Sequence, residues 1–342
     1  MTVTSRQLVL ASRPKGAPSK ENFELKKVDL PDLEKGEVLL RTIYLSLDPY
    51  MRGRMSDAES YAKPVEIGDV MVGATVCQVE KSKNDKYKEG DWVLAQTGWQ
   101  DYAISKGEGL TQLGKNPTNP SYALGILGMP GFTAYMGLLD IGAPKSGETV
   151  VVAAATGPVG ATVGQIAKIK GCKVVGVAGG LEKCQYAVEK LGFDACIDHK
   201  AEDFALQLKN ACKDGIDVYF ENVGGKVFDA VMPLLNACAR IPLCGLVSQY
   251  NASSLPEGPD RMFMLMGQLL RKRIKMQGFI IFEDYGDHYP EFSKEMQRWL
   301  KEDKISYREH MVEGIENTIA AFNDMLSGKN FGKTVVKINS PL

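Results

Sequence analysis

The stretch that decides the fold of this chain runs from Val150 to Gly160 and reads Val-Val-Val-Ala-Ala-Ala-Thr-Gly-Pro-Val-Gly. Its first residues are small, apolar and partly β-branched, which is typical of a strand buried on both faces. A glycine-bearing turn follows, and apolar residues then recur at helical spacing up to Gly171. A strand, a tight turn and a helix in this order predict the opening of a dinucleotide-binding βαβ unit, where a pyrophosphate binds free N–H groups at the helix N-terminus.

The turn departs from the usual G-x-G-x-x-G pattern, because Ala155 stands where the first glycine is expected. Taken alone, such a turn could also be an ordinary connection between a strand and a helix. A second apolar run at 172–178 arrives at the expected distance and favours nucleotide binding. We therefore predict that the turn contacts a dinucleotide through Thr156, Gly157, Pro158, Val159 and Gly160.

The residues after this second run predict which dinucleotide is bound. An NAD site places Asp or Glu about 20 residues past the glycine turn, where the carboxylate holds the ribose 2′-hydroxyl. Here that place is taken by Gly179 and Gly180, and Lys183 follows where it could pair with a 2′-phosphate. Lys183 could equally be a solvated lysine on the next helix. The missing acid and the available base together favour NADP over NAD.

Length and composition restrict the class of protein. A chain of 342 residues can hold two domains, and 44% hydrophobic with 24% charged residues is ordinary for a globular protein. The net charge of −1 gives no reason to expect a nucleic-acid or membrane-surface partner. No apolar run has membrane-spanning length, and the N-terminus does not resemble a secretion signal. Seven scattered cysteines indicate reduced, buried thiols and a cytoplasmic location.

Two kinds of pattern divide the chain. Short alternating runs separated by Pro, Gly and Asp fill residues 1–125 and return at 307–342, which predicts a small irregular β-barrel. Between them, residues 126–306 alternate helices and strands, which predicts a doubly wound parallel sheet. Within this α/β architecture we expect a helix at 122–139 broken near Pro130, a helix at 227–235, a strand at 239–245, and a C-terminal helix and strand at 315–326 and 334–338.

Several dispersed segments carry a family resemblance. They are Leu-Asp-Pro-Tyr-Met-Arg-Gly-Arg-Met at 47–55, Met-Pro-Gly-Phe-Thr-Ala-Tyr at 129–135, the turn at 155–160, Glu-Asn-Val-Gly-Gly at 221–225, Cys-Gly-Leu-Val-Ser-Gln-Tyr-Asn at 244–251 and Gly-Lys-Asn-Phe-Gly-Lys at 328–333. In this order they resemble the zinc-free branch of the medium-chain dehydrogenases/reductases that contains leukotriene B4 12-hydroxydehydrogenase/prostaglandin reductase and plant double-bond reductases. The resemblance covers almost the whole chain.

This resemblance implies a GroES-like domain at 1–125 and 307–342, a Rossmann NADP-binding domain at 126–306, NADPH as cofactor and a homodimer. The implied reaction reduces the activated C=C bond of α,β-unsaturated ketones or aldehydes, including curcumin-like enones. His199 stands where related sequences carry a tyrosine that touches the 2′-phosphate, although it could also be a surface histidine. Further cofactor contacts implied by the resemblance are Pro49, Met129, Thr133, Asn222, Cys244, Gly245, Ser248, Tyr250, Phe279, Ile280, Ile281, Asn330 and Gly332.

A metal site is not expected from the residues themselves. A catalytic zinc needs Cys and His ligands and a structural zinc needs clustered cysteines, whereas this chain has three histidines and no C-x-x-C pair. Residues 67–70 read Ile-Gly-Asp-Val where zinc-bearing relatives would carry a Gly-His-Glu ligand segment. Without a Lewis acid, reduction of an activated C=C bond is more plausible than oxidation of a plain alcohol, and the enolate would need an O–H donor.

Two tyrosines are candidates for this chemistry. Tyr250 follows a strand whose carboxyl end would face the nicotinamide, and the resembled enzymes hold a tyrosine at this motif position. We expect it to stabilise the enolate, with packing of a loop aromatic as the alternative. Tyr50 is a second candidate, which would position the substrate or lie at the edge of the barrel. The proton for the α-carbon is expected from solvent.

The substrate cleft is the least defined feature of the sequence. An apolar cleft could be lined by Met262, Phe263, Met264, Leu265, Met266, Phe282 and Tyr285, but such runs are more often core or a dimer face. Two other functions remain open: a zinc-free NADPH quinone reductase and a non-catalytic NADPH-binding protein. Near-neutral charge disfavours an RNA-associated form of the latter.

Overall fold

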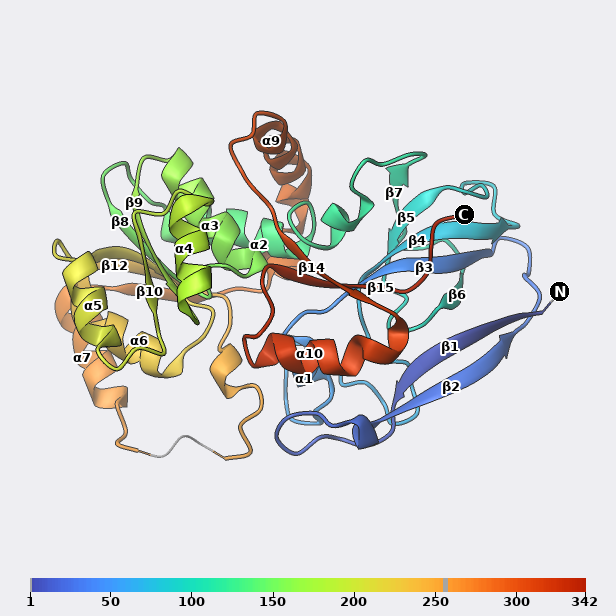
Figure 1. Ribbon diagram of the computed structural model, residues 1–342, viewed down its shortest axis with the longest axis horizontal. Coiled ribbons are helices and arrows are strands. Elements are labelled where there is room, and N and C mark those ends of the chain that lie inside the picture. The colour runs from blue at the N-terminus through green and yellow to red at the C-terminus, as the bar shows by residue number, and fades with distance from the viewer. Residues whose placement is uncertain (1, 255–257) are drawn as a thin grey trace. The chain divides into compact units, whose positions relative to one another are not determined.

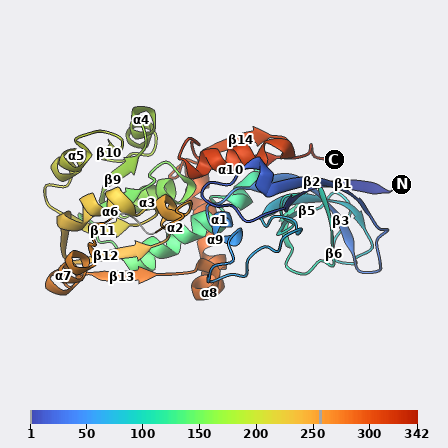
Figure 2. The ribbon, with the colours of Figure 1, turned by 90° about the horizontal axis from the view of Figure 1, so that it is seen from below.

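The strand predicted from Val150 lies in the middle of a six-stranded parallel sheet (Figure 1). The structure is a computed structural model, and it describes residues 2–254 and 258–342. All neighbouring strands of this sheet pair in parallel. Figure 2 shows β12 and β13 side by side. In spatial order the strands are β10 (Ala195–Asp198), β9 (Lys173–Ala178), β8 (Thr149–Ala153), β11 (Ile216–Phe220), β12 (Leu235–Leu243) and β13 (Lys275–Gly278).

Helices cover both faces of this sheet. They are α2 (Met129–Met136), α3 (Pro158–Ile169), α4 (Leu181–Glu189), α5 (Phe204–Ala211), α6 (Gly225–Val231), α7 (Met262–Lys272), α8 (Ile281–Tyr285) and α9 (Tyr289–Lys301). On one face, Tyr219 of β11 packs against Phe228 of α6, with ring centroids 6.2 Å apart. On the other face, Phe220 lies so close to Gly137 that a Cβ there would be 2.9 Å from its ring. Since successive strand residues point to opposite faces, β11 is buried on both.

These strands and helices belong to one of two units into which the chain divides, Ile126–Arg308, and the other comprises Met1–Gly125 with Glu309–Leu342. The unit formed by Met1–Gly125 and Glu309–Leu342 is the β-rich unit. It holds a hairpin, β1 (Val3–Leu10) with β2 (Phe23–Leu30), and a seven-stranded sheet. That sheet contains β3 (Val38–Ser46), β4 (Thr75–Ser82), β5 (Trp92–Ala95), β6 (Tyr102–Ser105), β7 (Thr111–Gly114), β14 (Glu309–Glu313) and β15 (Lys333–Lys337), with helices α1 (Met51–Arg54) and α10 (Thr318–Leu326).

The predicted fold class, an irregular β domain combined with a doubly wound parallel sheet, is therefore confirmed, but several boundaries were wrong. Pro130 does not break a helix; it lies in the first turn of α2, where its missing N–H would have no helical partner. Strand β12 begins at Leu235 because Leu235 pairs with Ile216, so the predicted helix ends early and the strand starts early. Strand β14, which pairs in parallel with β15, was not predicted.

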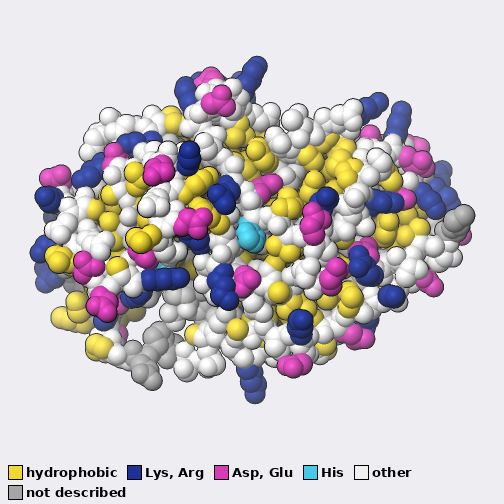
Figure 3. All heavy atoms as spheres, in the orientation of Figure 1, with side chains coloured by type: hydrophobic (Ala, Val, Ile, Leu, Met, Phe, Trp, Pro, Cys, Tyr) yellow, Lys and Arg dark blue, Asp and Glu magenta, His cyan; other side chains and the backbone are white. Residues whose placement is uncertain are grey.

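Surface and thiol chemistry add little that is unusual. Lys/Arg and Asp/Glu side chains are interspersed on the face drawn in Figure 3, in keeping with the small net charge. All seven cysteines lie in the described ranges as free thiols. Burial was expected for them, but Cys238 is exposed. No helix of the described chain is long and apolar enough to cross a bilayer.

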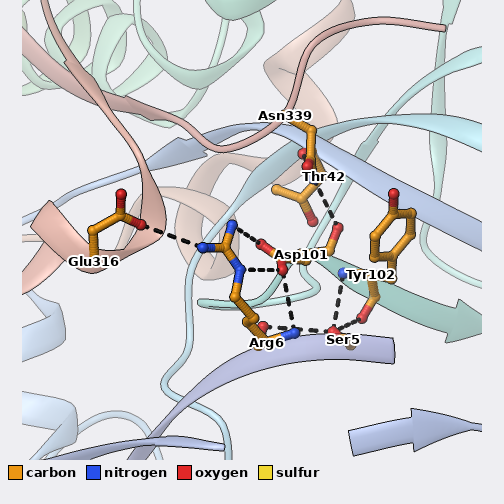
Figure 4. Close-up of polar contacts among 7 residues, drawn as sticks. All are labelled: Ser5, Arg6, Thr42, Asp101, Tyr102, Glu316 and Asn339. Carbon is orange, nitrogen blue, oxygen red and sulfur yellow. Dashed lines mark hydrogen bonds and ion pairs between the residues drawn. The ribbon is translucent and has the colours of Figure 1, made fainter. Parts of the chain in front are cut away.

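A buried carboxylate joins distant segments of the β-rich unit (Figure 4). Asp101 accepts hydrogen bonds from Arg6 Nε at 2.7 Å, Arg6 Nη2 at 3.2 Å and the Arg6 amide at 3.2 Å. Its backbone oxygen accepts from the Thr42 amide at 2.9 Å. Glu316 contacts the same guanidinium at 3.4 Å, but its side chain is 59% exposed. The bidentate Arg6–Asp101 contact links β1 to the segment before β6.

Replacing Asp101 with Asn should lower the free energy of unfolding by about 1.5–3 kcal/mol, because hydrogen bonds to a charged, buried group are lost. The matched change Glu316→Gln removes the exposed contact and should lower it by less than about 0.5 kcal/mol. Urea denaturation followed by circular dichroism measures both. Equal effects of the two changes would contradict this assignment.

Candidate functional site

Most of the predicted cofactor residues of the unit Ile126–Arg308 follow carboxyl ends of its parallel strands. The turn at 156–160 follows β8, Gly179 follows β9, His199 follows β10, Asn222 follows β11 and Cys244 follows β12. The carboxyl ends of parallel strands meet at one edge of a sheet, and connections leave β8 and β11 in opposite directions there. In open α/β sheets this crossover is where ligands bind.

The turn after β8 brings helix α3 unusually close to the strand. Gly157 is the N-cap of α3, and Pro158 occupies the first turn. A Cβ on Gly160 would lie 2.3 Å from the carbonyl oxygen of Ala154, a distance that real side chains do not tolerate. Gly160 therefore permits the close helix–strand contact, and the N–H groups of the first helical turn face the sheet edge as a ready anion site.

Asn222 spans the crossover between β11 and β8. Its side-chain amide donates to the carbonyl oxygen of Ala153 at 2.8 Å, while its own backbone oxygen accepts from the Val247 amide at 3.2 Å. Asn222 thus links the end of β8 to the segment that follows β12. This places it between the glycine turn and the segment that carries Tyr250.

Sequence reasoning missed the carboxylate beside it. Glu221 is 1% exposed, and its Oε1 accepts from the amides of Val223 at 2.6 Å and Gly224 at 2.8 Å. The backbone oxygen of Glu221 also accepts from the amides of Cys244 and Gly245 at 3.0 and 3.2 Å. Burial raises the pKa of this carboxyl above its usual range. Only the fold could identify Glu221 as a residue that shapes the site.

Basic groups gather after β9, after β10 and at the start of α6. The pKa of the half-buried Lys183 is lowered by burial and then by the charge of Lys200, and the pKa of His199 is lowered by burial and then by the charge of Lys226. The buried Nδ1 of His199 has no hydrogen-bond partner among the described residues. Mutual repulsion of this kind is relieved by an anion, because a bound phosphate favours the charged form of each group. Lys200 and Lys226 were not predicted from the sequence.

Tyr250 ends the short 3-10 helix η5 (Val247–Gln249) and is half-buried. Its hydroxyl oxygen accepts from the Leu246 amide at 3.4 Å and lies close to Gly245, where a Cβ would be 3.0 Å away. The oxygen is therefore held over the segment that follows β12. Ser248 fixes the same segment by donating from Oγ to the carbonyl oxygen of Val223 at 2.6 Å.

The remaining predicted contacts of this unit lie on α2 and after β13. Thr133 is buried within α2 and Met129 begins that helix. Phe279 and Ile281 are buried, and Ile280 between them is half-buried. The apolar run at 262–266 does not belong to the core of this unit: Phe263 is 88% exposed on α7, and its neighbours Met262, Met264 and Met266 are exposed as well.

The β-rich unit holds the other predicted residues. Pro49 and Tyr50 form the turn before α1, and Tyr50 is its N-cap. Burial, followed by the charge of Asp48, raises the pKa of Tyr50, so it remains a neutral phenol. Asn330 donates from Nδ2 to the carbonyl oxygen of Gly332 at 2.9 Å, which stiffens the segment before β15.

Comparison with known proteins identifies the family. Residues 6–113 match the model described as the N-terminal domain of oxidoreductase, and residues 158–301 match the model described as zinc-binding dehydrogenase. The chain is 65% identical to the NADPH-dependent curcumin reductase of Escherichia coli (strain K12), over 98% of this chain and 97% of that protein. It is a medium-chain dehydrogenase/reductase.

Within this superfamily the chain belongs to the prostaglandin reductase branch, as the sequence resemblance predicted. It is 44% identical to prostaglandin reductase 1 of Mus musculus, over 98% of this chain and 99% of that protein. Among solved structures, the crystal structure of CurA in complex with NADPH from Vibrio vulnificus matches with a TM-score of 0.96 and 69% identity, covering 98% of this chain and all of that one.

The geometry of this medium-chain dehydrogenase/reductase fits a phosphorylated dinucleotide. Gly160 leaves room for a close backbone approach, the start of α3 offers N–H groups, and the basic group after β9 and β10 includes an unpartnered buried nitrogen on His199. No carboxylate lies between Gly179 and Lys183 except the exposed Glu182. Which residues contact NADPH stays a prediction from the sequence, and the structure adds Lys200 and Lys226 as basic neighbours of Lys183 and His199.

The name of the second family model raises the question of zinc. Zinc sites in proteins need three or four His, Cys, Asp or Glu ligands within bonding distance of one point. Across residues 2–254 and 258–342, no group of three or more such side chains is placed to hold a metal ion. The described residues do not fit a zinc site, and no step of the chemistry is assigned to one.

Proposed function

We propose that this chain is an NADPH-dependent reductase of C=C bonds conjugated to a carbonyl group, acting on bulky, flat, curcumin-like enones. The single observation that carries the proposal is the near full-length identity of 65% to a curcumin reductase of the same branch. The basic group around Lys183 and His199 supports the choice of NADPH over NADH, since a ribose 2′-phosphate needs positive partners and no opposing carboxylate.

The residues of the chain have distinct tasks in this reaction. NADPH, when bound, supplies the hydride that goes to the β-carbon of the enone. Negative charge then develops on the carbonyl oxygen, and the hydroxyl of Tyr250 donates a hydrogen bond to this enolate. The Leu246 amide, which donates to the Tyr250 oxygen, fixes that hydroxyl in place. Solvent supplies the proton for the α-carbon.

Tyr50 positions the substrate in this proposal. Burial and the negative charge of Asp48 keep it a neutral phenol, which can donate as well as accept a hydrogen bond. Phe279, Ile280 and Ile281 form the apolar wall beside the nicotinamide, because they follow β13 at the carboxyl edge of the sheet.

A substrate panel tests the activity directly. With NADPH and an enone, an enal or a diarylheptanoid, absorbance of the reduced nicotinamide at its near-ultraviolet band should fall, and the product should have gained two hydrogens across the C=C bond by mass spectrometry. Quinones and plain alcohols serve as the comparison set. Turnover of quinones alone, or NADPH binding with no turnover of any compound, would refute the proposal.

Replacing Lys183 with Ala should weaken NADPH binding by roughly tenfold or more and leave NADH binding nearly unchanged, because a hydrogen bond to a charged group contributes about 1.5–3 kcal/mol. Quenching of protein fluorescence gives both dissociation constants. Lys190→Ala is the matched control, since Lys190 is the exposed C-cap of the same helix and should change neither constant. Equal weakening of NADPH and NADH would remove the 2′-phosphate role.

Replacing Tyr250 with Phe should lower kcat by about 10²-fold, because one donor to the developing enolate is lost. The dissociation constant of NADPH should stay close to that of the parent. Tyr102→Phe, which removes a phenol hydroxyl from β6 of the other unit, is the control and should leave kcat unchanged. Steady-state kinetics with a saturating enone decide the matter, and an unaltered kcat in Tyr250→Phe would reduce Tyr250 to a packing residue.

The active form is proposed to be a homodimer. Two features of the unit Ile126–Arg308 support it: β13 is an edge strand of the six-stranded sheet, and α7 exposes a run of Met and Phe side chains. Edge strands and large exposed apolar faces commonly pair with a second copy. Light scattering after size-exclusion chromatography should give twice the chain mass of 37.4 kDa, and a monomer at micromolar concentration would contradict the proposal.

A further inference from the structure

A fully buried ion pair lies where β3 ends in the β-rich unit. The side chain of Lys333 is 0% exposed, and its Nζ donates to Asp48 Oδ1 at 2.6 Å and to the carbonyl oxygen of Leu47 at 2.7 Å. The second oxygen of Asp48 accepts a hydrogen bond from the hydroxyl of Ser46. Both charges are therefore satisfied by partners inside the protein.

Stability alone does not explain this pair. Its neighbours Leu45, Leu47 and Met51 belong to an apolar core cluster. Removing two charges from water is unfavourable by several kcal/mol per ion, and an apolar pair of similar volume is often as stable or more stable. Burial accordingly lowers the pKa of Lys333 from its usual value. A buried ion pair does, however, enforce one geometry, because each partner has few acceptable positions.

The geometry that it enforces is the exit of the chain from β3 towards Tyr50. Lys333 is the first residue of β15, and the Leu47 amide donates to the Thr334 carbonyl oxygen at 3.2 Å. Pro49 restricts Asp48 to extended backbone conformations. The Asp48 carbonyl oxygen then accepts from the Met51 amide at 3.1 Å, which closes the turn that presents Tyr50. The hydrogen bonds from Lys333 to Leu47 and Asp48 therefore fix the direction in which the chain enters this turn.

A second carboxyl faces the same lysine from the neighbouring strand. Glu309 of β14 is the register partner of Lys333, and Ser121 donates to its Oε2 at 2.9 Å. Burial raises the pKa of Glu309, and the charge of Lys333 acts against that rise. Lys333 therefore lies between the carboxyl groups of Asp48 and Glu309, and its loss would remove the cation that contacts the buried Asp48 carboxylate.

We propose that Asp48 and Lys333 are positioning residues of the reductase, which hold the Tyr50 turn at the start of α1 in the orientation needed for the enone. They act through Tyr50 and do not touch the substrate. The inference rests on the proposed function for Tyr50, and it extends that function to a buried charged pair that was not among the site residues predicted from the sequence.

Paired variants separate positioning from stability. Lys333→Met alone leaves the buried Asp48 carboxylate without the lysine charge and should lower the melting temperature by more than about 6 °C. The double variant Asp48→Asn with Lys333→Met removes both charges and should melt within about 4 °C of the parent. Its kcat/KM for an enone should nevertheless fall between about tenfold and hundredfold, since small misplacements of a positioning group have effects of this size.

A control pair and a coupling test complete the design. Arg41 and Glu80 form an ion pair in the same unit, with Arg41 Nε 2.6 Å from Glu80 Oε2. The double variant Arg41→Met with Glu80→Gln should keep the kcat/KM of the parent. Tyr50→Phe should itself lower kcat/KM, and adding it to the Asp48/Lys333 double variant should cause no further loss, because residues acting as one unit are not additive.

The outcomes are decisive. A double variant with parental stability and parental kcat/KM would overturn the proposal. A Tyr50→Phe variant with parental kcat/KM would also overturn it. So would a triple variant whose loss of kcat/KM equals the product of the losses in Tyr50→Phe and in the double variant. If the parent reduced no enone, the proposed function would fail on its own. Amide hydrogen exchange at residues 47–54 would then still test the positioning role of Asp48 and Lys333. Exchange at least tenfold faster in the double variant than in the parent and in the control variant would support that role, and unchanged exchange would refute it.

Discussion

The close approach of α3 to β8 is the constraint on which the cofactor site depends. It exists because position 160 carries no Cβ, since any side chain there would overlap the carbonyl oxygen of Ala154. A helix packed this tightly against the middle strand of a sheet directs its first N–H groups to the strand's carboxyl edge. The predicted contacts Gly179, Asn222 and Cys244 follow strands that end on the same edge, so their proposed role depends on where α3 begins.

The crossover between β8 and β11 brings together groups that are distant in sequence. Asn222 reaches across it to Ala153, and the buried carboxyl of Glu221 organises the amides that follow. Backbone atoms of the same segment receive hydrogen bonds from residues 244–248, which lead to Tyr250. The glycine turn and the proposed enolate donor are therefore joined through one short, hydrogen-bonded segment. The Oε1 atom of Glu221 is satisfied by these amides, whereas its buried Oε2 has no hydrogen-bond partner among the described residues.

Charge is used in two different ways in the two units. Lys183 after β9 lies near Lys200, and His199 after β10 lies near Lys226 of α6; burial first, and then the neighbouring positive charge, lowers the pKa of Lys183 and of His199, which favours a bound phosphate. In the β-rich unit, Lys333 and Asp48 already neutralise each other in an apolar surrounding. The first arrangement is proposed to bind the 2′-phosphate of NADPH, whereas the second is proposed to hold the turn that carries Tyr50. Both are unfavourable for a protein that needs only stability, which is why they indicate function.

The sequence by itself determined the class of fold and the family, because the apolar run at 150–153 with its glycine turn, and the motifs at 47–55, 221–225 and 244–251, are local patterns. It also indicated NADPH from the missing acid beside Gly179. Only the tertiary structure decided that Pro130 lies in the first turn of α2, that β12 begins at Leu235, and that most of the apolar run at 262–266 is exposed. It alone revealed Glu221, Lys200, Lys226 and Lys333 as partners of the predicted site residues. The physical reason is that register, burial and ion pairing depend on contacts between residues far apart in the chain, which no local pattern records.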